Sequence, residues 1–321
     1  MASSNNSNST LASRSRRLRV RTFAVTCLSE DTGILEWVPD TDSMRNLVSK
    51  SYNPQTTPYC PRRRGSRMTN FGDASMRSNF ERSQNQFFKN GCLTQAAKMY
   101  YNLCLKQNPP VLSWWFVQHF SSATDWYEAR KKFTLTAAAW SAIGHVIGLG
   151  DRHSENILVE TTTGRIIHVD FDCIFDKGLN LPRPEVVPFR LTPNMLDAFG
   201  PTGADGMFSS GMESCLEILR DNRDTLLSVL EPFIKDPVID WKRHRTQQTV
   251  SSTRIPSHIM GKDSHGEAKR SIHVIKERLS GICNLRNPNY RKLQGQVQKL
   301  CAEASKNENL IQLYVGWMPW V

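Results

Sequence analysis

The spacing of apolar and polar residues predicts a mostly helical chain with two short β-hairpins. Residues 18–40 contain two runs rich in β-branched and aromatic residues, and the Asp and Gly within 29–33 indicate a turn between them. A second pair of runs, 157–160 and 165–169, is separated by the polar turn 161–164. Both pairs are short enough for antiparallel hairpins.

Helical periodicity accounts for most of the remaining pattern. The predicted helices lie near residues 44–48, 93–107, 112–120, 125–148, 209–232 and 266–280. Asp125 is expected to be the N-cap of the fourth helix. Within this helix Trp126, Phe133, Ala137 and Trp140 recur at near-helical spacing, which favours burial in the core over contact with a ligand.

Two other segments differ from this pattern. Residues 53–80 are rich in Pro, Arg, Ser and Asn and are expected to form a loop or an insertion. The last residues, 309–321, are apolar and aromatic to the end of the sequence, so we expect them to pack against the rest of the chain. The side chains predicted to make this contact are Leu313, Tyr314, Trp317 and Trp320.

Composition indicates a chain with an ordinary core and no membrane span. Of the 321 residues 39% are hydrophobic, and the mean hydropathy is −0.46. The most apolar stretch, 135–150, is shorter than the roughly 20 apolar residues that a bilayer span requires. The eight cysteines occur singly, without the paired spacing of a zinc or redox motif, which favours reduced thiols in an intracellular compartment.

Charge adds less than its size suggests. The formal net charge of +11 is spread along the chain without interleaved aromatic residues, so it fits a solvated surface or partial anion binding and does not predict direct sequence-specific nucleic-acid recognition. The Ser- and Arg-rich start has no acid before Glu30, as in a mitochondrial transit peptide. The alternative is a disordered segment over 1–17 that leads into a strand.

The stretch "GLGDRHSENILV" at 148–159, followed by "IIHVDFD" at 166–172, carries the candidate chemistry. Asn156 and Asp170 are equidistant from Thr163, so an antiparallel hairpin is expected to bring them together at its open end. A carboxamide and a carboxylate beside a loop suit a magnesium ion that keeps its other positions for phosphate oxygens and water.

Asp151 precedes Asn156 by five residues, which gives the spacing of a phosphoryl-transfer loop. In such a site Asp151 positions the attacking hydroxyl or accepts its proton, and His153 donates a hydrogen bond to the transferring phosphoryl group or orients Asp151. Either short motif alone is also typical of a salt-bridged turn or a capped helix end. Their combination, with a hairpin between them, favours the catalytic interpretation.

The order Asp-Arg-His, together with the later His-x-Asp-Phe, resembles the phosphatidylinositol-3-kinase-related protein kinases. Within that family the chain is most similar to the ATR-type DNA-damage checkpoint kinases, over most of 18–241 and 289–321. Four segments carry this resemblance: "RTFAVTCLSEDTGILEWVPDT", "HVDFDCIFDKG", "PEVVPFRLTPNMLDAFGPTG" and "LIQLYVGWMPWV".

The resemblance implies an α+β, protein-kinase-like fold with a mostly helical C-lobe, short β-hairpins and an incomplete N-lobe. The implied divisions are a disordered N-terminus at 1–17, the end of the N-lobe and the hinge at 18–40, the C-lobe at 41–241, a regulatory linker at 242–288 and a FATC-like segment at 289–321.

The same resemblance implies roles for individual residues. The implied catalytic residues are Asp151 and His153, and the implied ligands of Mg²⁺ or Mn²⁺ are Asn156 and Asp170. Around the adenine of ATP, the implied contacts are stacking by Trp37, backbone hydrogen bonds from Val38, and an apolar floor of Leu158 and Val169.

The implied activity is transfer of the γ-phosphate of ATP to protein Ser or Thr, preferably before Gln, in the nuclear DNA-damage checkpoint. A regulatory partner would recruit the kinase to damaged DNA. The family's Gly-rich loop and ATP lysine precede the hinge, and residues 1–17 contain neither Gly nor Lys, so the chain is expected to be a piece of a larger kinase.

Two alternatives stay open. The chain as written could be inactive and serve as an interaction module through its FATC-like tail and basic linker. A lipid kinase is the other alternative. Lipid kinases carry a basic cluster in the activation segment, which corresponds here to "CIFDKGLNLPRPEVVPFRLT" at 173–192, but only Lys177 and Arg183 precede Arg190 in this segment.

Overall fold

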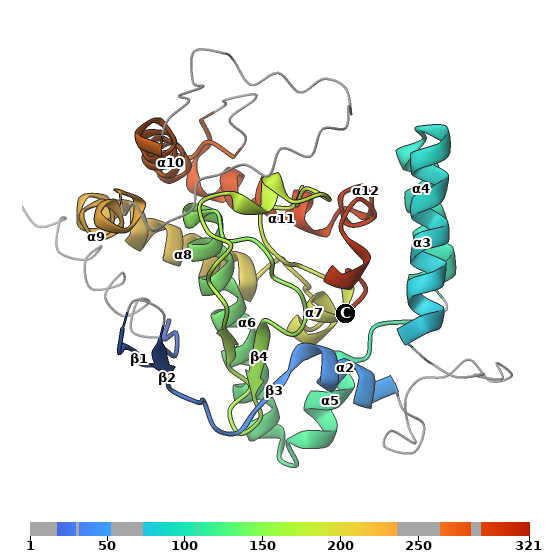
Figure 1. Cartoon of the computed structure of the whole chain (residues 1–321). Coiled ribbons are helices and arrows are strands. Elements are labelled where there is room, and N and C mark those ends of the chain that lie inside the picture. The colour runs from blue at the N-terminus through green and yellow to red at the C-terminus, as the bar shows by residue number, and fades with distance from the viewer. Residues whose placement is uncertain (1–17, 30–31, 53–72, 107, 236–263, 284–289) are drawn as a thin grey trace, which may run out of the picture.

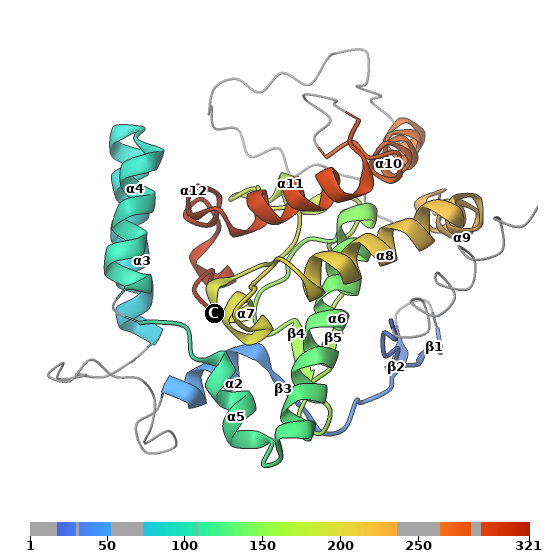
Figure 2. The same ribbon diagram turned by 180° about the vertical axis from the view of Figure 1, so that it is seen from behind.

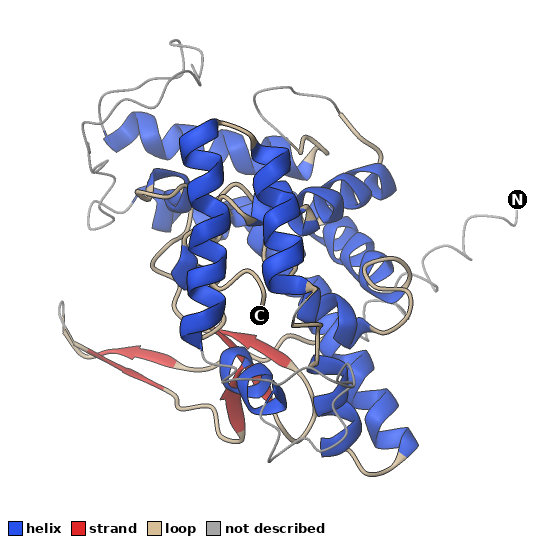
Figure 3. Ribbon diagram, turned by 90° about the vertical axis from the view of Figure 1, so that its right-hand side faces the viewer, coloured by secondary structure: helices blue, strands red, loops and turns tan. Residues whose placement is uncertain are grey.

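The computed structural model describes residues 18–29, 32–52, 73–106, 108–235, 264–283 and 290–321. Helices form most of this part of the chain, and short strands pair at two places (Figures 1, 2 and 3). The arrangement confirms the predicted α+β class. No helix in the described ranges combines the length and the apolar character that crossing a membrane would need.

The strands are β1 (Val25–Cys27), β2 (Gly33–Leu35), β3 (Thr41–Ser43), β4 (Ile157–Glu160) and β5 (Ile166–His168). The helices are α2 (Met44–Tyr52), α3 (Asp73–Asn90), α4 (Leu93–Tyr100), α5 (Leu112–His119), α6 (Ala123–Ile147), α7 (Pro193–Phe199), α8 (Met207–Asp221), α9 (Arg223–Lys235), α10 (Ser264–Leu279), α11 (Leu293–Ser305) and α12 (Asn307–Leu310). A π-helical turn, η1 (Tyr101–Leu105), follows α4, and two 3-10 turns are η2 (Lys177–Asn180) and η4 (Val315–Trp317).

Helix α6 runs through the centre of the helical layer and packs along α8 (Figure 2). Ser122, and not the predicted Asp125, is its N-cap, because the Ser122 hydroxyl oxygen accepts the Asp125 N–H at 3.0 Å. Asp125 lies in the first turn, where its charge favours the helix dipole. At the other end Gly148 takes a left-handed conformation, φ +65°, and ends the helix just before the candidate catalytic loop.

The predicted apolar face of α6 lies in the core. Phe133 and Ala137 are buried, while Trp126 and Trp140 are half-buried against the same cluster. The Trp140 ring stacks on His168 at a centroid distance of 4.6 Å, and its indole N–H donates to the Ile166 carbonyl at 3.2 Å. These contacts hold β5 against the helix that precedes the candidate loop.

His145, near the end of α6, gives a prediction for stability against pH. Its ring is buried, and its pKa lies well below the ordinary value because burial disfavours the charged form and Arg278 repels it. Below about pH 6.5 the unfolded chain therefore binds a proton that the folded chain does not. This one histidine should lower the free energy of unfolding by up to about 1.4 kcal/mol per pH unit.

We expect His145→Gln to make urea unfolding less sensitive to pH between about pH 6.5 and pH 5 than it is in the unmodified chain. Measurements at about pH 8, where an unfolded histidine is neutral, give each protein its own reference. Identical pH slopes for both proteins would show that His145 is not held neutral by the fold.

The two predicted hairpins form, and β3 adds a strand that the sequence pattern did not reveal. Strands β1 and β2 pair antiparallel in a sheet of their own, whereas β3, β4 and β5 form a second antiparallel sheet in that order. β3 is short and polar, so neither its length nor its apolar content distinguishes it from a loop.

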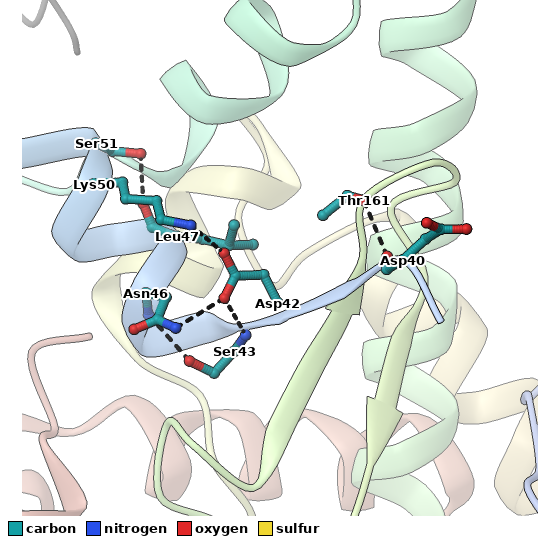
Figure 4. Close-up of polar contacts among 8 residues, drawn as sticks. All are labelled: Asp40, Asp42, Ser43, Asn46, Leu47, Lys50, Ser51 and Thr161. Atoms are coloured by element: carbon teal, nitrogen blue, oxygen red, sulfur yellow. Dashed lines mark hydrogen bonds and ion pairs between the residues drawn. The ribbon is translucent and has the colours of Figure 1, made fainter. Parts of the chain in front are cut away.

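The segment from Asp40 to α2 fixes the predicted hinge to the second sheet (Figure 4). The Asp40 carbonyl accepts the Thr161 N–H at 2.8 Å and its hydroxyl at 3.0 Å. The Ser43 hydroxyl accepts the Asn46 N–H at 3.2 Å, and the Asp42 carboxylate accepts the Ser43 N–H at 2.9 Å. These bonds start α2 and hold the end of the hinge beside the β4–β5 turn.

Part of the predicted 53–80 loop is helical. Residues 53–72 lie outside the described residues, but α3 begins at Asp73, so the loop prediction is wrong from there. Most of α3 is polar, and only a narrow stripe faces the core, which explains the error. The buried residues of this stripe are Met76, Phe80, Ser83 and Gln84.

The C-terminal segment packs on the helices, as predicted, with one exception. Leu313, Trp317 and Trp320 are buried, but Tyr314 is 60% exposed, so its predicted contact is wrong. The Gln84 side chain of α3 donates to the main-chain oxygens of two tail residues, Ile311 at 2.8 Å and Leu313 at 2.6 Å. The end of the chain thus lies between α3 and α7 (Figure 1).

Candidate active site

Asp151 has a left-handed backbone conformation that neighbouring residues hold in place. Its φ is +54°, which is uncommon for a residue with a side chain. The Glu185 carboxylate accepts the Asp151 N–H with both oxygens at 3.0 Å. The Asn156 side-chain amide donates to the Asp151 carbonyl at 3.0 Å. Both peptide groups of Asp151 are therefore fixed, and the half-buried side chain projects from a rigid turn.

The β4–β5 hairpin brings Asn156 next to the His-x-Asp-Phe motif at 168–171, which we call the metal motif, but the register of the hairpin differs from the predicted one. Ile157 pairs with His168, so Asn156 lies opposite Val169, whose N–H donates to the Asn156 carbonyl at 3.1 Å. The predicted Asn156–Asp170 pairing is therefore wrong by one residue. The turn contains an even number of residues, 161–164, so its centre falls after Thr162 and not on Thr163.

Asp170 follows directly after this last pair and takes a left-handed conformation, φ +61°. In a regular strand a residue next to Val169 would point to the opposite face. The positive φ ends the strand at this point and changes the direction of the chain, so strand alternation does not fix the side chain of Asp170. Both Asn156 and Asp170 remain at the open end of the hairpin, beside the turn that holds Asp151.

Arg152 ties the catalytic loop to the metal motif. Its buried guanidinium donates to the Gly150 carbonyl at 2.9 Å, to the Val169 carbonyl at 2.6 Å and to the Asp170 carbonyl. Burial lowers its pKa, and the charges of Asp170, Asp151 and Glu185 oppose this shift. Arg152 is thus a buried base whose hydrogen bonds join two segments of the candidate active site.

His153 lies in the same loop, half-buried, with one ring nitrogen already in use. Its Nδ1 accepts the Glu155 N–H at 3.2 Å. A neutral ring in this arrangement carries its proton on Nε2. His153 can therefore donate one hydrogen bond to a group outside the loop, which is the first of the two roles predicted for it.

The site concentrates negative charge, which suits a divalent cation. Burial and the neighbouring carboxylates of Asp170 and Asp151 raise the pKa of Asp172. Among the described residues no group of three or more His, Cys, Asp and Glu side chains could hold a metal by itself. The donor set thus fits an ion that takes few protein ligands, such as an amide oxygen from Asn156 and a carboxylate oxygen from Asp170.

Two of the predicted adenine contacts, Leu158 and Val169, lie on the β4–β5 hairpin close to Asn156, whereas Trp37 and Val38 lie on the segment that leads into β3, which pairs with β4 at Glu160. Leu158 and Val169 are half-buried and share the sheet face that points away from the main core, together with the buried Ile167. Val38 is buried, and Trp37 is 85% exposed. Strand β4 spans on the order of 13 Å between the hinge side and Asn156, a length that suits an extended nucleotide. The role of Trp37 and Val38 in binding remains a prediction.

Two charged residues of the activation segment, Glu185 and Arg190, support the site but were not predicted from the sequence. Glu185 contacts Asp151, as described above. Arg190 is fully buried and donates to the carbonyl oxygens of Arg152 at 3.0 Å, Trp317 at 2.7 Å and Met318 at 2.7 Å. Burial lowers the pKa of Arg190 to about 9. The only sequence signal was two charges within the otherwise apolar run "PEVVPFRLT".

The chain belongs to the phosphatidylinositol 3- and 4-kinase family, whose model matches residues 6–243, and the FATC domain model matches residues 292–321. It is 38% identical to the serine/threonine-protein kinase ATR of Arabidopsis thaliana over 316 residues, which cover 96% of this chain and 10% of the relative. It is 36% identical to protein kinase rad3 of Schizosaccharomyces pombe over 303 residues, 94% of this chain and 11% of the relative.

Among solved structures, the FAT and kinase domain of CtTel1 matches 98% of this chain and 20% of its own length, with 28% identity and a TM-score of 0.76. These matches confirm the predicted family resemblance and the kinase-like fold. The chain spans about a tenth of the length of the curated relatives it matches.

Proposed function

We propose that this chain is the catalytic C-lobe of a checkpoint Ser/Thr protein kinase that transfers the γ-phosphate of ATP to protein hydroxyls. One observation carries the proposal: Asp151, Asn156 and the start of the Asp170 motif meet at one end of the β4–β5 hairpin, with Asn156 bonded directly to the Asp151 backbone. The serine/threonine kinases among its relatives support the choice of reaction.

The residues divide the chemistry as follows. Asp151 accepts the proton of the attacking hydroxyl. The hydrogen bonds to its N–H and its carbonyl fix the backbone from which the carboxylate projects. His153 offers its Nε2 proton to a phosphoryl oxygen. Asn156 and Asp170 hold Mg²⁺, or Mn²⁺, which neutralises charge on the phosphates when bound.

The substrate is protein Ser or Thr, preferably followed by Gln, and the site of action is the nucleus. These choices, and recruitment to damaged DNA by a regulatory partner protein, rest on the resemblance to the ATR-type checkpoint kinases, and the serine/threonine-protein kinase ATR among the relatives supports the choice of Ser or Thr. A lipid substrate is less well supported, because the activation segment offers only Lys177 and Arg183 before Arg190, and Arg190 is buried.

We further propose that activity requires a region upstream of this chain. The β1–β2 hairpin exposes apolar side chains that a soluble domain normally covers, with exposed fractions of 58–65% at Val25, Leu28, Ile34 and Leu35. The resemblance to protein kinases implies that the rest of the N-lobe covers the β1–β2 hairpin. Without that region the chain would act only as an interaction module, through its packed C-terminal segment and basic linker.

The proposed division of the chain follows from this function. Residues 18–40 end the N-lobe and form the hinge, 41–241 form the C-lobe, 242–288 the regulatory linker and 289–321 the FATC-like segment. Residues 1–17, predicted to be disordered, lie outside the described residues, as does most of the linker before α10. The described part of the linker, residues 264–283, consists mostly of helix α10.

The test is a chimera in which the upstream kinase region of the Arabidopsis relative is joined to residue 18 of this chain. With MgATP the chimera is expected to phosphorylate a Ser-Gln peptide at least about tenfold faster than a matched Ser-Ala peptide, whereas residues 1–321 alone are expected to show no turnover. Phosphorylation of phosphatidylinositol vesicles in place of both peptides would overturn the protein-kinase proposal, and so would an inactive chimera that folds.

A further inference from the structure

The activation segment contacts the candidate catalytic loop directly through Glu185. Its carboxylate accepts the Asp151 N–H with both oxygens at 3.0 Å, although the two residues are 34 positions apart in sequence. The Glu185 N–H in turn donates to the Gly178 carbonyl at 3.1 Å, so residues 178–185 form a loop whose two ends meet beside Asp151. The carboxylate therefore lies at the junction of the two segments.

Two glycines leave the space that this carboxylate occupies. A Cβ atom on Gly150 would lie 2.7 Å from the nearer Glu185 carboxylate oxygen, and one on Gly178 would lie 2.6 Å from the same oxygen. Neither glycine has a positive φ, so backbone conformation does not demand glycine at these positions. A methyl group at either position would instead displace the Glu185 carboxylate, which fits between the two backbones.

Glu185 also lies where an ionised carboxylate loses part of its hydration, which costs free energy unless other groups compensate. It is partly enclosed by the tail residue Trp317 and by Cys173, and burial raises its pKa. In the described part of the chain no lysine or arginine forms an ion pair with it, so its hydrogen bond to Asp151 is the main compensation for burial, and the nearby Arg152 charge adds to it. A charged acceptor strengthens that bond beyond a neutral one.

We propose that Glu185 is a positioning residue for Asp151: its carboxylate holds the Asp151 N–H and thereby keeps the catalytic aspartate in its left-handed conformation only while the activation segment is docked. The link from this contact to catalysis rests on the proposed kinase function. The contact itself does not, so the two are tested separately.

The contact is tested by hydrogen exchange at the Asp151 amide in the 321-residue chain, measured by NMR. In Glu185→Ala the protection of this amide is expected to fall about tenfold or more, while amides in the core helix α8, such as that of Leu216, keep theirs. Glu185→Gln retains a side-chain oxygen and should recover much of the protection. Unchanged protection of Asp151 in Glu185→Ala would overturn the proposal.

Gly178→Ala alone covers the case in which Glu185→Ala unfolds, and where Glu185→Ala folds the two changes form a double-mutant cycle. The added methyl group should displace the intact carboxylate and lower Asp151 protection to a similar extent. In a Glu185→Ala background the same methyl group meets no carboxylate, so its further effect should be small. Additive effects of the two changes, or full protection in Gly178→Ala, would contradict a carboxylate fitted between the glycines.

The catalytic consequence is tested in the chimera. Glu185→Ala should lower kcat about tenfold or more, with the KM for ATP unchanged, because the nucleotide contacts lie on the β4–β5 hairpin and the hinge. Loss of Asp151 protection without loss of kcat would overturn the positioning role. If the unmodified chimera were inactive, the proposed function would fail, while the exchange data would still decide the contact.

Discussion

Replacing Asp151 by asparagine in the chimera is expected to lower kcat by about 10²–10⁴-fold, the range for losing a general base. Asparagine keeps the backbone N–H that Glu185 holds and the carbonyl that Asn156 holds, so the loop should retain its conformation. The KM for ATP should therefore change little. Steady-state kinetics with the Ser-Gln peptide, at saturating MgATP, measures both constants.

The matched control is Asp224→Asn on α9, the same chemical change at a side chain that is 90% exposed. It should leave both constants unchanged. Asp170→Asn provides a contrast, because the loss of a proposed metal ligand should raise the Mg²⁺ concentration needed for half-maximal rate. If Asp151→Asn retained full activity, or if only its KM changed, Asp151 would not be the base.

The helices could be predicted where a wide apolar face repeats, and they were missed where that face is narrow. α6 shows its periodicity openly, since Phe133 and Ala137 recur on its buried side. α3 buries only a thin stripe under many polar residues, so composition alone suggests a loop. The N-cap of α6 was predicted at the wrong residue because Ser122 and Asp125 are both good capping residues. Only the geometry shows that the Ser122 hydroxyl accepts the hydrogen bond.

The proximity of Asp151, Asn156 and the start of the Asp170 motif could be predicted from the sequence, whereas their supporting contacts could not, and their chemical roles remain predictions. Motif spacing located Asp151, Asn156 and Asp170, because the hairpin between them is short and its turn is readable. The braces come from charged side chains that contact main-chain oxygens and amides, such as the buried Arg152 and the half-buried Glu185. No spacing rule relates a side chain to a backbone atom many residues away, so such contacts require coordinates.

The same limit applies to the tail, where Arg190 makes the decisive contacts. Its guanidinium lies 4.1 Å from the centre of the Trp317 ring and donates to the main-chain oxygens of the last turn, including Val321 at 2.9 Å. The apolar composition of the tail predicted that it would pack. It could not predict that a buried cation would join it to the catalytic loop through the Arg152 carbonyl.

Trp317→Ala is therefore expected to destabilise the chain by about 3–5 kcal/mol, the usual cost of truncating a large aromatic side chain in a core. The Trp317 ring is 4% exposed. Its removal also takes away the aromatic face beneath the Arg190 guanidinium. Urea unfolding of residues 1–321 at neutral pH measures the change in the free energy of unfolding.

Tyr314→Ala is the matched control, since it also removes an aromatic ring from the tail, but from a position that is 60% exposed. Its expected cost is about 0.5 kcal/mol or less. If Trp317→Ala does not fold, Trp317→Phe keeps a ring over Arg190 and should lie between the two. Equal effects of the Trp317 and Tyr314 substitutions, or an unchanged unfolding midpoint in Trp317→Ala, would mean that the tail does not stabilise the lobe through Arg190. Arg190 donates to the Arg152 carbonyl in the candidate catalytic loop and also to carbonyls of the tail. Such a result would therefore mean that the loop keeps its conformation without the contact between Arg190 and the tail.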